Sequence, residues 1–196
     1  MRKVQGVGLN DADYQTDITE WVGGKQKLIW RCPYHVKWKG MLRRCYSKDA
    51  YKTYKENKAE VCKEWLTFSV FRAWLQTFDI PEGKLGSYDL DKDILGAGNL
   101  YSPDTCALLP HKVNTFILDK AKTESPYPVG VYYNKSRFIA RCNNPLTGKR
   151  ESLGSYLCPE EAHQAWKSRK LQILDLLKVE CELLDEVYNA LIRKFS

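Results

Sequence analysis

A period-two alternation of apolar and polar residues constrains the last third of this chain more than any other feature. From residue 137 to 143, Phe138, Ala140 and Cys142 alternate with arginine, isoleucine and asparagine residues. This pattern predicts a strand with one face in a core and the other in water. The run NNPLTGK at residues 143–149 predicts a hairpin turn, and residues 150–156 the partner strand.

A helix signal follows these strands. Pro159 and the acids Glu160 and Glu161 are the residue types that a first helical turn favours. Four apolar residues then recur at spacings that place them toward the sheet: Ala162, Ala165, Trp166 and Ile173. We therefore expect residues 125–178 to form a three-stranded antiparallel sheet packed on one helix, with Phe138, Ala140 and Trp166 buried between them.

The positive charge of the chain concentrates in this same segment. The 196 residues include 31 Lys and Arg against 24 Asp and Glu, a net charge of +7. Residues 125–170 hold 8 cations and 3 acids (8 − 3 = +5), whereas residues 171–196 hold 3 cations and 5 acids (3 − 5 = −2). A basic segment of this kind is typical of a surface that binds phosphates. A well-solvated basic surface without a ligand is the alternative.

The first part of the chain, to about residue 82, is expected to be largely helical. Trp38, Met41, Leu42 and Cys45 recur at the spacing of an amphipathic helix, and the apolar residues from 61 to 74 predict a second helix over 67–77. The four tryptophans between residues 30 and 74 are interpreted as core residues, because each large aromatic buries about 150–250 Å².

Residues 86–119 predict the order strand, loop, strand, helix. Residues 88–94 alternate like a strand, 96–99 form a loop, and 102–104 form a turn. Residues 106–109 predict a short buried strand, and Pro110 suits the first turn of a helix that continues to Leu118.

This segment resembles the HNH endonuclease family with its ββα-metal finger, specifically a divergent branch of free-standing phage homing-type proteins. The matching residues are Leu90-Asp91-Lys92-Asp93-Ile94, Gly98-Asn99, Tyr101-Ser102-Pro103, Cys106, Pro110 and Asn114. Residues 6–14, 38–46 and 61–65 also resemble that branch. The resemblance implies an α+β fold, with a helical N-terminal domain over 1–122 that contains the finger at about 86–119.

The resemblance assigns roles position by position. Asp91 and Asn114 match the residues that hold one divalent metal, and their hard oxygen ligands suit Mg²⁺ or Mn²⁺. Asn99 matches the asparagine that braces the loop. Lys92 stands where the family has its histidine general base. A lysine, with a pKa of about 10.4, keeps its proton at neutral pH. Lys92 is therefore interpreted as a phosphate clamp or a transition-state cation, and His111, one turn before Asn114, as the other catalytic candidate.

Residues 123–196, with their C-terminal helix, resemble the DNA-binding domain of plant ethylene-response factors, which also occurs on phage HNH proteins. The matching residues are Gly130-Val131-Tyr132, Phe138-Ile139-Ala140, Leu153-Gly154-Ser155-Tyr156 and Glu160-Glu161-Ala162. The resemblance implies that the outer face of the sheet contacts DNA. The family's tryptophans are missing here, so its target sequence is not carried over. The expected DNA-binding residues are Tyr132, Asn134, Lys135, Arg137, Arg141, Asn143, Arg150 and Ser152.

We therefore expect a sequence-directed DNA-binding protein, a Mg²⁺-dependent HNH-type endonuclease of the nicking or homing kind that hydrolyses phosphodiester bonds. The alternative is an inactive HNH scaffold that binds nucleic acid or a protein partner. Double-stranded DNA is the expected partner, and the oligomeric state is left open.

The cysteines and the hydropathy bear on location and on metal chemistry. Seven cysteines without an apolar signal region favour a reducing compartment, the cytoplasm, which would be that of an infected bacterial host if the chain is phage-encoded. No apolar run is long enough for a membrane span. A structural zinc at Cys32, His35, Cys45 and Cys62 is disfavoured, since the chain has no Cys-x-x-Cys pair.

Overall fold

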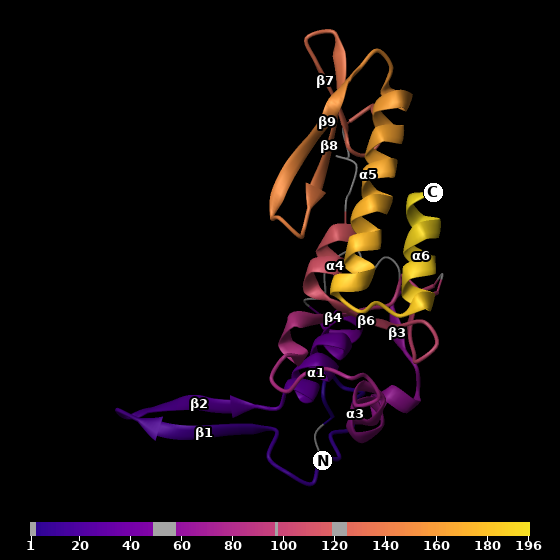
Figure 1. Cartoon of the computed structure of the whole chain (residues 1–196). Helices are drawn as coiled ribbons and strands as arrows, with labels where there is room; N and C mark the ends of the chain where they lie inside the picture. Colours follow the sequence, from indigo (N-terminus) through magenta and orange to yellow (C-terminus); the bar gives the residue numbers. More distant parts are fainter. Residues whose placement is uncertain (1–2, 49–57, 97, 119–124) are drawn as a thin grey trace. The chain divides into compact units, whose positions relative to one another are not determined.

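A computed structural model describes residues 3–48, 58–96, 98–118 and 125–196 of the mixed α+β chain (Figure 1). The chain divides into two compact units, 1–108 and 109–196. Helix α4 (His111–Ile117) falls in the second of these units. Helix α4 belongs to the second unit because its Phe116 packs edge-on against Phe195, with the ring centroids 5.5 Å apart.

The described part of the first unit contains helices α1 (Pro33–Tyr46) and α3 (Phe68–Leu75) and an aromatic core. Both helices form where the apolar spacing predicts them. Between them, the 3-10 turn Glu64–Leu66 carries the fully buried Trp65. The indole Nε1 of Trp38 donates a hydrogen bond to the carbonyl of Trp65 at 2.7 Å, so the one polar atom of this buried ring is satisfied.

A two-stranded hairpin in the first unit was not expected from the sequence. Strands β1 (Asp17–Val22) and β2 (Lys25–Arg31) pair antiparallel and extend away from α1 (Figure 1). Gly23 and Gly24 both have positive φ, +61° and +77°, the requirement of a type I′ turn. The prediction that all four tryptophans lie in the core is wrong for Trp30, which lies on this hairpin and is 42% exposed.

The predicted order strand, loop, strand, helix is present. Strand β4 (Tyr88–Asp91) pairs with β6 (Ala107–Pro110), and α4 follows β6 directly. The first strand ends earlier than residue 94, because a turn begins after Asp91. Strand β5 (Leu100–Tyr101) pairs in parallel with β3 (Glu60–Val61).

The second unit confirms the fold expected for residues 125–178. Strands β7 (Val131–Asn134), β8 (Arg137–Asn144) and β9 (Lys149–Tyr156) form an antiparallel sheet in that order. Helix α5 (Pro159–Glu180) follows, and then α6 (Asp185–Phe195). Ala140 and Trp166 are buried, and Phe138 is half-buried against the same core. Arg137 and Arg141 lie outside this interface, as the alternation requires.

The chain enters this sheet at Gly130, where both the backbone conformation and the space available require a glycine. Its φ is +82°, and a Cβ at this position would overlap the Trp166 ring, lying 2.6 Å from the indole nitrogen. We predict that Gly130→Ala lowers the free energy of unfolding by about 1–3 kcal/mol, because overpacking and a left-handed alanine act together. Chemical denaturation would measure the loss. The matched control, Gly148→Ala, shares a positive φ but meets nothing within 4 Å. An equal loss in both variants would contradict the role of Trp166.

Candidate nucleic-acid interface

The strand register places seven of the eight expected DNA-binding residues on the outer face of the sheet. Tyr132 lies opposite Ile139, Asn134 opposite Arg137, Arg141 opposite Ser152, and Asn143 opposite Arg150. Side chains opposite one another project from the same face of a sheet. The eighth, Lys135, lies in the turn between β7 and β8, with φ +45°. We call this surface the outer face, and its members are Tyr132, Asn134, Arg137, Ile139, Arg141, Asn143, Arg150 and Ser152.

The one carboxylate in the three strands faces away from this surface. Glu151 lies opposite Cys142, which is buried on the helix side. Arg169 of α5 donates to both Glu151 carboxylate oxygens, at 2.7 and 3.2 Å, and the Asn144 amide donates at 2.7 Å. These hydrogen bonds lower the pKa of Glu151 below its ordinary range, and those from Arg169 have the largest effect. The negative charge of Glu151 is thus neutralised on the inner side, and the charged side chains of the outer face are all arginines.

Arg141 is held in place on the central strand. Its guanidinium carbon lies 4.4 Å from the centroid of the Tyr132 ring, which is the geometry of a cation–π contact. Both side chains are half-buried. A guanidinium that is stacked in this way has lost part of its rotamer freedom before it meets a ligand, so less conformational entropy is lost on binding.

Asp91 organises the start of the loop that follows β4. Its Oδ1 accepts hydrogen bonds from the backbone amides of Asp93 and Ile94, at 2.9 and 3.0 Å. This is the local capping that short acidic side chains make in turns. Asp91 therefore has a structural role in addition to the predicted metal-binding role.

Lys92 is buried, with 7% of its surface exposed. Its ammonium forms an ion pair with Asp93 and donates to the carbonyl of Gly98 at 3.2 Å. Lys92 thereby joins the end of β4 to Gly98. Asn99 is exposed, and its backbone carbonyl accepts a bond from the amide of Glu60 at 2.7 Å. The loop is held by Lys92 and by this backbone bond, while a bracing role for the Asn99 side chain stays a prediction.

Helix α4 carries the other two predicted site residues. His111 is exposed, and its Nε2 lies 3.5 Å from the hydroxyl of Thr115. Asn114 is half-buried one turn further on. Asp91 belongs to the first unit and Asn114 to the second. Their joint binding of one metal therefore stays a prediction.

The donor set fits a hard cation. Carboxylate and carboxamide oxygens suit Mg²⁺, which keeps several of its waters and needs few protein ligands. Among the described residues, no three His, Cys, Asp or Glu side chains gather as a metal cluster.

The residues considered for a structural zinc have other surroundings. The Cys32 thiol lies 3.2 Å from the Tyr14 hydroxyl, and burial raises the pKa of Cys45 to about 11. His35 packs against Phe68, with the ring centroids 5.1 Å apart. Burial therefore favours the protonated form of the Cys45 thiol, and the expectation against a structural zinc at these residues stays a prediction.

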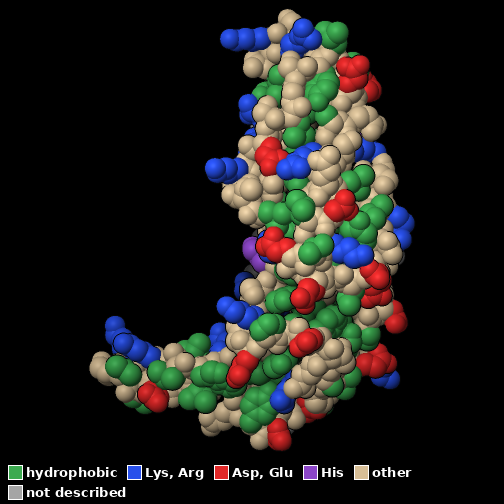
Figure 2. Space-filling model, viewed as in Figure 1, with side chains coloured by type: hydrophobic (Ala, Val, Ile, Leu, Met, Phe, Trp, Pro, Cys, Tyr) green, Lys and Arg blue, Asp and Glu red, His purple; other side chains and the backbone are tan. Residues whose placement is uncertain are grey.

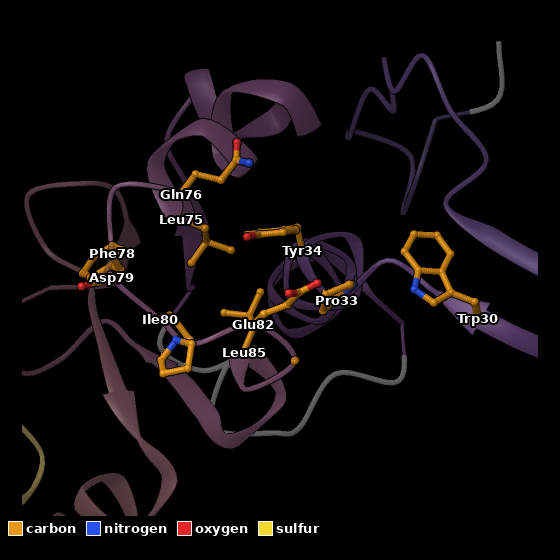
Figure 3. Close-up of a pocket in the computed structure, with 12 residues that line it drawn as sticks. Trp30, Pro33, Tyr34, Leu75, Gln76, Phe78, Asp79, Ile80, Glu82 and Leu85 are labelled. Atoms are coloured by element: carbon orange, nitrogen blue, oxygen red, sulfur yellow. The ribbon is translucent and has the colours of Figure 1, made fainter.

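A pocket of about 560 Å³ opens in the first unit between the start of α1, the end of α3 and the following loop (Figure 3). Trp30, Tyr34 and Phe78 supply its aromatic lining, and Asp79 and Glu82 its charged lining. No predicted site residue lines it. Because both charges are negative, this pocket does not suit a phosphate.

The hairpin β1–β2 is the surface that sequence reasoning missed. Six large apolar side chains on it are exposed: Ile18, Trp21, Val22, Leu28, Ile29 and Trp30. Figure 2 shows hydrophobic side chains along this hairpin. The paired glycines between two strand-forming runs were the signal that could have revealed it.

Comparison of the chain with protein-family models, curated proteins and solved structures finds no match. Of the helices that the structure describes, none has the length and apolarity needed to cross a membrane.

Proposed function

We propose that this protein binds double-stranded DNA through the outer face of the β7–β9 sheet and cuts it as a Mg²⁺-dependent HNH-type endonuclease. The observation that carries the DNA-binding part is the segregation of charge in the sheet. Arg137, Arg141 and Arg150 lie on the outer face, and the single carboxylate, Glu151, is turned inward and paired. Such a surface attracts phosphates without opposing charge.

The outer face also offers groups that distinguish bases. Arginine recognises guanine through two hydrogen bonds in the major groove, and asparagine recognises adenine in the same way. Arg141 and Asn143 are two residues apart on β8, a separation of about 7 Å along a strand. Arg141, ordered by Tyr132, is the residue that we assign to a base edge, and the exposed Arg137 and Arg150 are assigned to phosphates.

The cutting function rests on the resemblance of residues 86–119 to the ββα-metal finger and on the observed order of strands and helix. Asp91 and Asn114 would hold the metal through their side-chain oxygens. When bound, Mg²⁺ neutralises charge on the scissile phosphate and lowers the pKa of a water. Lys92 keeps the loop closed behind Asp91, and His111 is the candidate proton acceptor.

A second function is favoured by one observation. Lys92 replaces the family's base, and its ammonium is buried and bonded to Asp93 and Gly98. This arrangement is that of a loop brace, which a scaffold without catalysis would also retain. The alternative is therefore a DNA-binding protein that has kept the HNH fold and acts by occupying its site or a protein partner.

A plasmid-nicking assay separates the two functions. The full-length protein is incubated with supercoiled and linear DNA in Mg²⁺, in Mn²⁺ and in excess EDTA, and DNA binding is measured in parallel. The endonuclease proposal expects nicking that EDTA abolishes. Binding without cleavage under every condition would refute the enzyme and favour the scaffold.

The proton acceptor is tested by single-turnover cleavage rates against pH. We predict that His111→Ala lowers the rate about 10²–10⁴-fold if His111 is the general base, because that is the usual contribution of such a group. Lys92→His should raise the rate by restoring the family's base, and Lys92→Ala should lower it. Gln164→Ala, which changes an exposed position on α5, is the control, and its rate should match that of the wild type. An unchanged rate in His111→Ala would exclude His111 as the acceptor.

A further inference from the structure

Lys170 is a fully buried lysine at the meeting point of three helices of the second unit. It projects from α5, and its Nζ donates to the backbone carbonyl of Phe116 in α4 at 2.5 Å. The same nitrogen lies 3.5 Å from the Phe116 ring centroid, 5.0 Å from that of Phe195 in α6, and 5.5 Å from that of Trp166. An ammonium group thus occupies an aromatic enclosure inside the core.

The Lys170 ammonium lies at the C-terminal end of helix α4. Removing an ammonium from water is costly, and lysine is rarely buried unless it is paired. Helix α4 ends at Ile117, and its last turn contains no basic residue. The terminal carbonyls of a helix carry partial negative charge and lack partners within the helix. Lys170 supplies the cation and the donor that this helix end requires.

Lys170 and Trp166 together connect α4 to the sheet. Trp166 lies one helical turn before Lys170 on α5, and its ring packs against Gly130 at the entry to β7. A second link, the ion pair of Lys112 and Glu180, joins α4 to the end of α5. All of these residues belong to the unit 109–196.

We infer that Lys170 is a positioning residue, which fixes α4, with His111 and Asn114, to the body that carries the outer face. The inference rests on the proposed function for the roles of those two residues. It adds that the helix of the finger and the DNA-reading sheet move as one body. Both elements belong to the second unit, so His111 and Asn114 would keep a fixed position relative to the outer face.

The test compares Lys170→Met, Lys170→Arg and the wild type in the full-length chain. Methionine keeps the apolar length without the donor, and arginine keeps charge and donors. Lys194→Met is the control, since it removes an equal charge from an exposed position on α6. Hydrogen–deuterium exchange of residues 109–118 and of β7–β9 is measured alongside DNA affinity and single-turnover cleavage.

In Lys170→Met we expect amides of α4 to exchange about tenfold faster or more, the factor for losing a hydrogen bond from a charged donor. Exchange in the sheet and DNA affinity should stay within about twofold, while the cleavage rate falls with α4 protection. Lys170→Arg should recover much of that protection. Equal acceleration in sheet and helix, or unchanged α4 exchange, would overturn the inference.

Two further measurements decide the inference if Lys170→Met does not fold or if the wild type does not cut DNA. If Lys170→Met does not fold, wild-type exchange decides: α4 amides should be as slow as those of α5, and much faster exchange in α4 would overturn the inference. If the wild type does not cut DNA, the endonuclease proposal fails, whereas the exchange data still test whether Lys170 holds α4.

Discussion

Asp91→Asn is expected to abolish Mg²⁺-dependent cleavage while leaving the loop after β4 folded. The asparagine oxygen can still accept the bonds from the amides of Asp93 and Ile94. It lacks the charge that holds the metal. We expect the single-turnover rate to fall by about a thousandfold, because a catalytic metal is worth several kcal/mol and each 1.4 kcal/mol is a factor of ten. Asn114→Ala should have an effect of the same order.

The control for this prediction is Asp104→Asn, which removes one charge from an exposed position in the same segment. Its cleavage rate should match that of the wild type. DNA affinity in the absence of metal should be similar in all three variants. A normal rate in Asp91→Asn, or an equal loss in Asp104→Asn, would remove Asp91 from the metal site.

The sheet and long helix of the second unit could be predicted from the sequence because apolar and polar residues alternate along β8. Ala140 and Cys142 are almost fully buried, and Arg137 and Asn143 are exposed. A shift of one residue would exchange these faces, so the pattern fixes both the strand and its outer face. The pattern shows which residues share the outer face, whereas their assignment to DNA comes from the resemblance to the ethylene-response-factor domain and stays a prediction.

The hairpin β1–β2 could not be predicted by this reasoning, since it has no buried face. Trp21, Leu28 and Trp30 are exposed on it, and an expectation that tryptophan belongs in a core fails there. An isolated two-stranded hairpin is at best marginally stable in water, so its local sequence must favour the turn strongly. Gly23 and Gly24 meet that need, and turn residues were the only available signal.

The surroundings of the finger residues also escaped prediction, because they depend on contacts between distant segments. Lys92 differs from the histidine of the HNH pattern that this segment resembles, but its bonds to Asp93 and Gly98 require the folded loop. Lys170 contacts the carbonyl of Phe116 across 54 positions of sequence. No periodicity in α5 distinguishes a lysine that is buried from one that is solvated, since both fall on a helical spacing.

The double variant Arg141→Ala/Arg150→Ala is expected to lose most of the affinity for DNA. Removing an arginine that contacts a base costs about 1–3 kcal/mol and relaxes specificity at that position. Loss of a phosphate contact instead weakens binding to all sequences and reduces the salt slope by about one. Arg141, stacked on Tyr132, should show the first behaviour, and the exposed Arg150 the second. Arg193→Ala, which changes an exposed cation on α6, is the control.

A salt titration of DNA binding by the full-length wild type, the double variant and Arg193→Ala tests the central proposal most directly. The proposal predicts that the double variant binds roughly a hundredfold more weakly, with a salt slope about one unit shallower, while Arg193→Ala follows the wild type. A double variant that matched the wild type in both affinity and salt slope would show that the outer face of the sheet does not bind DNA.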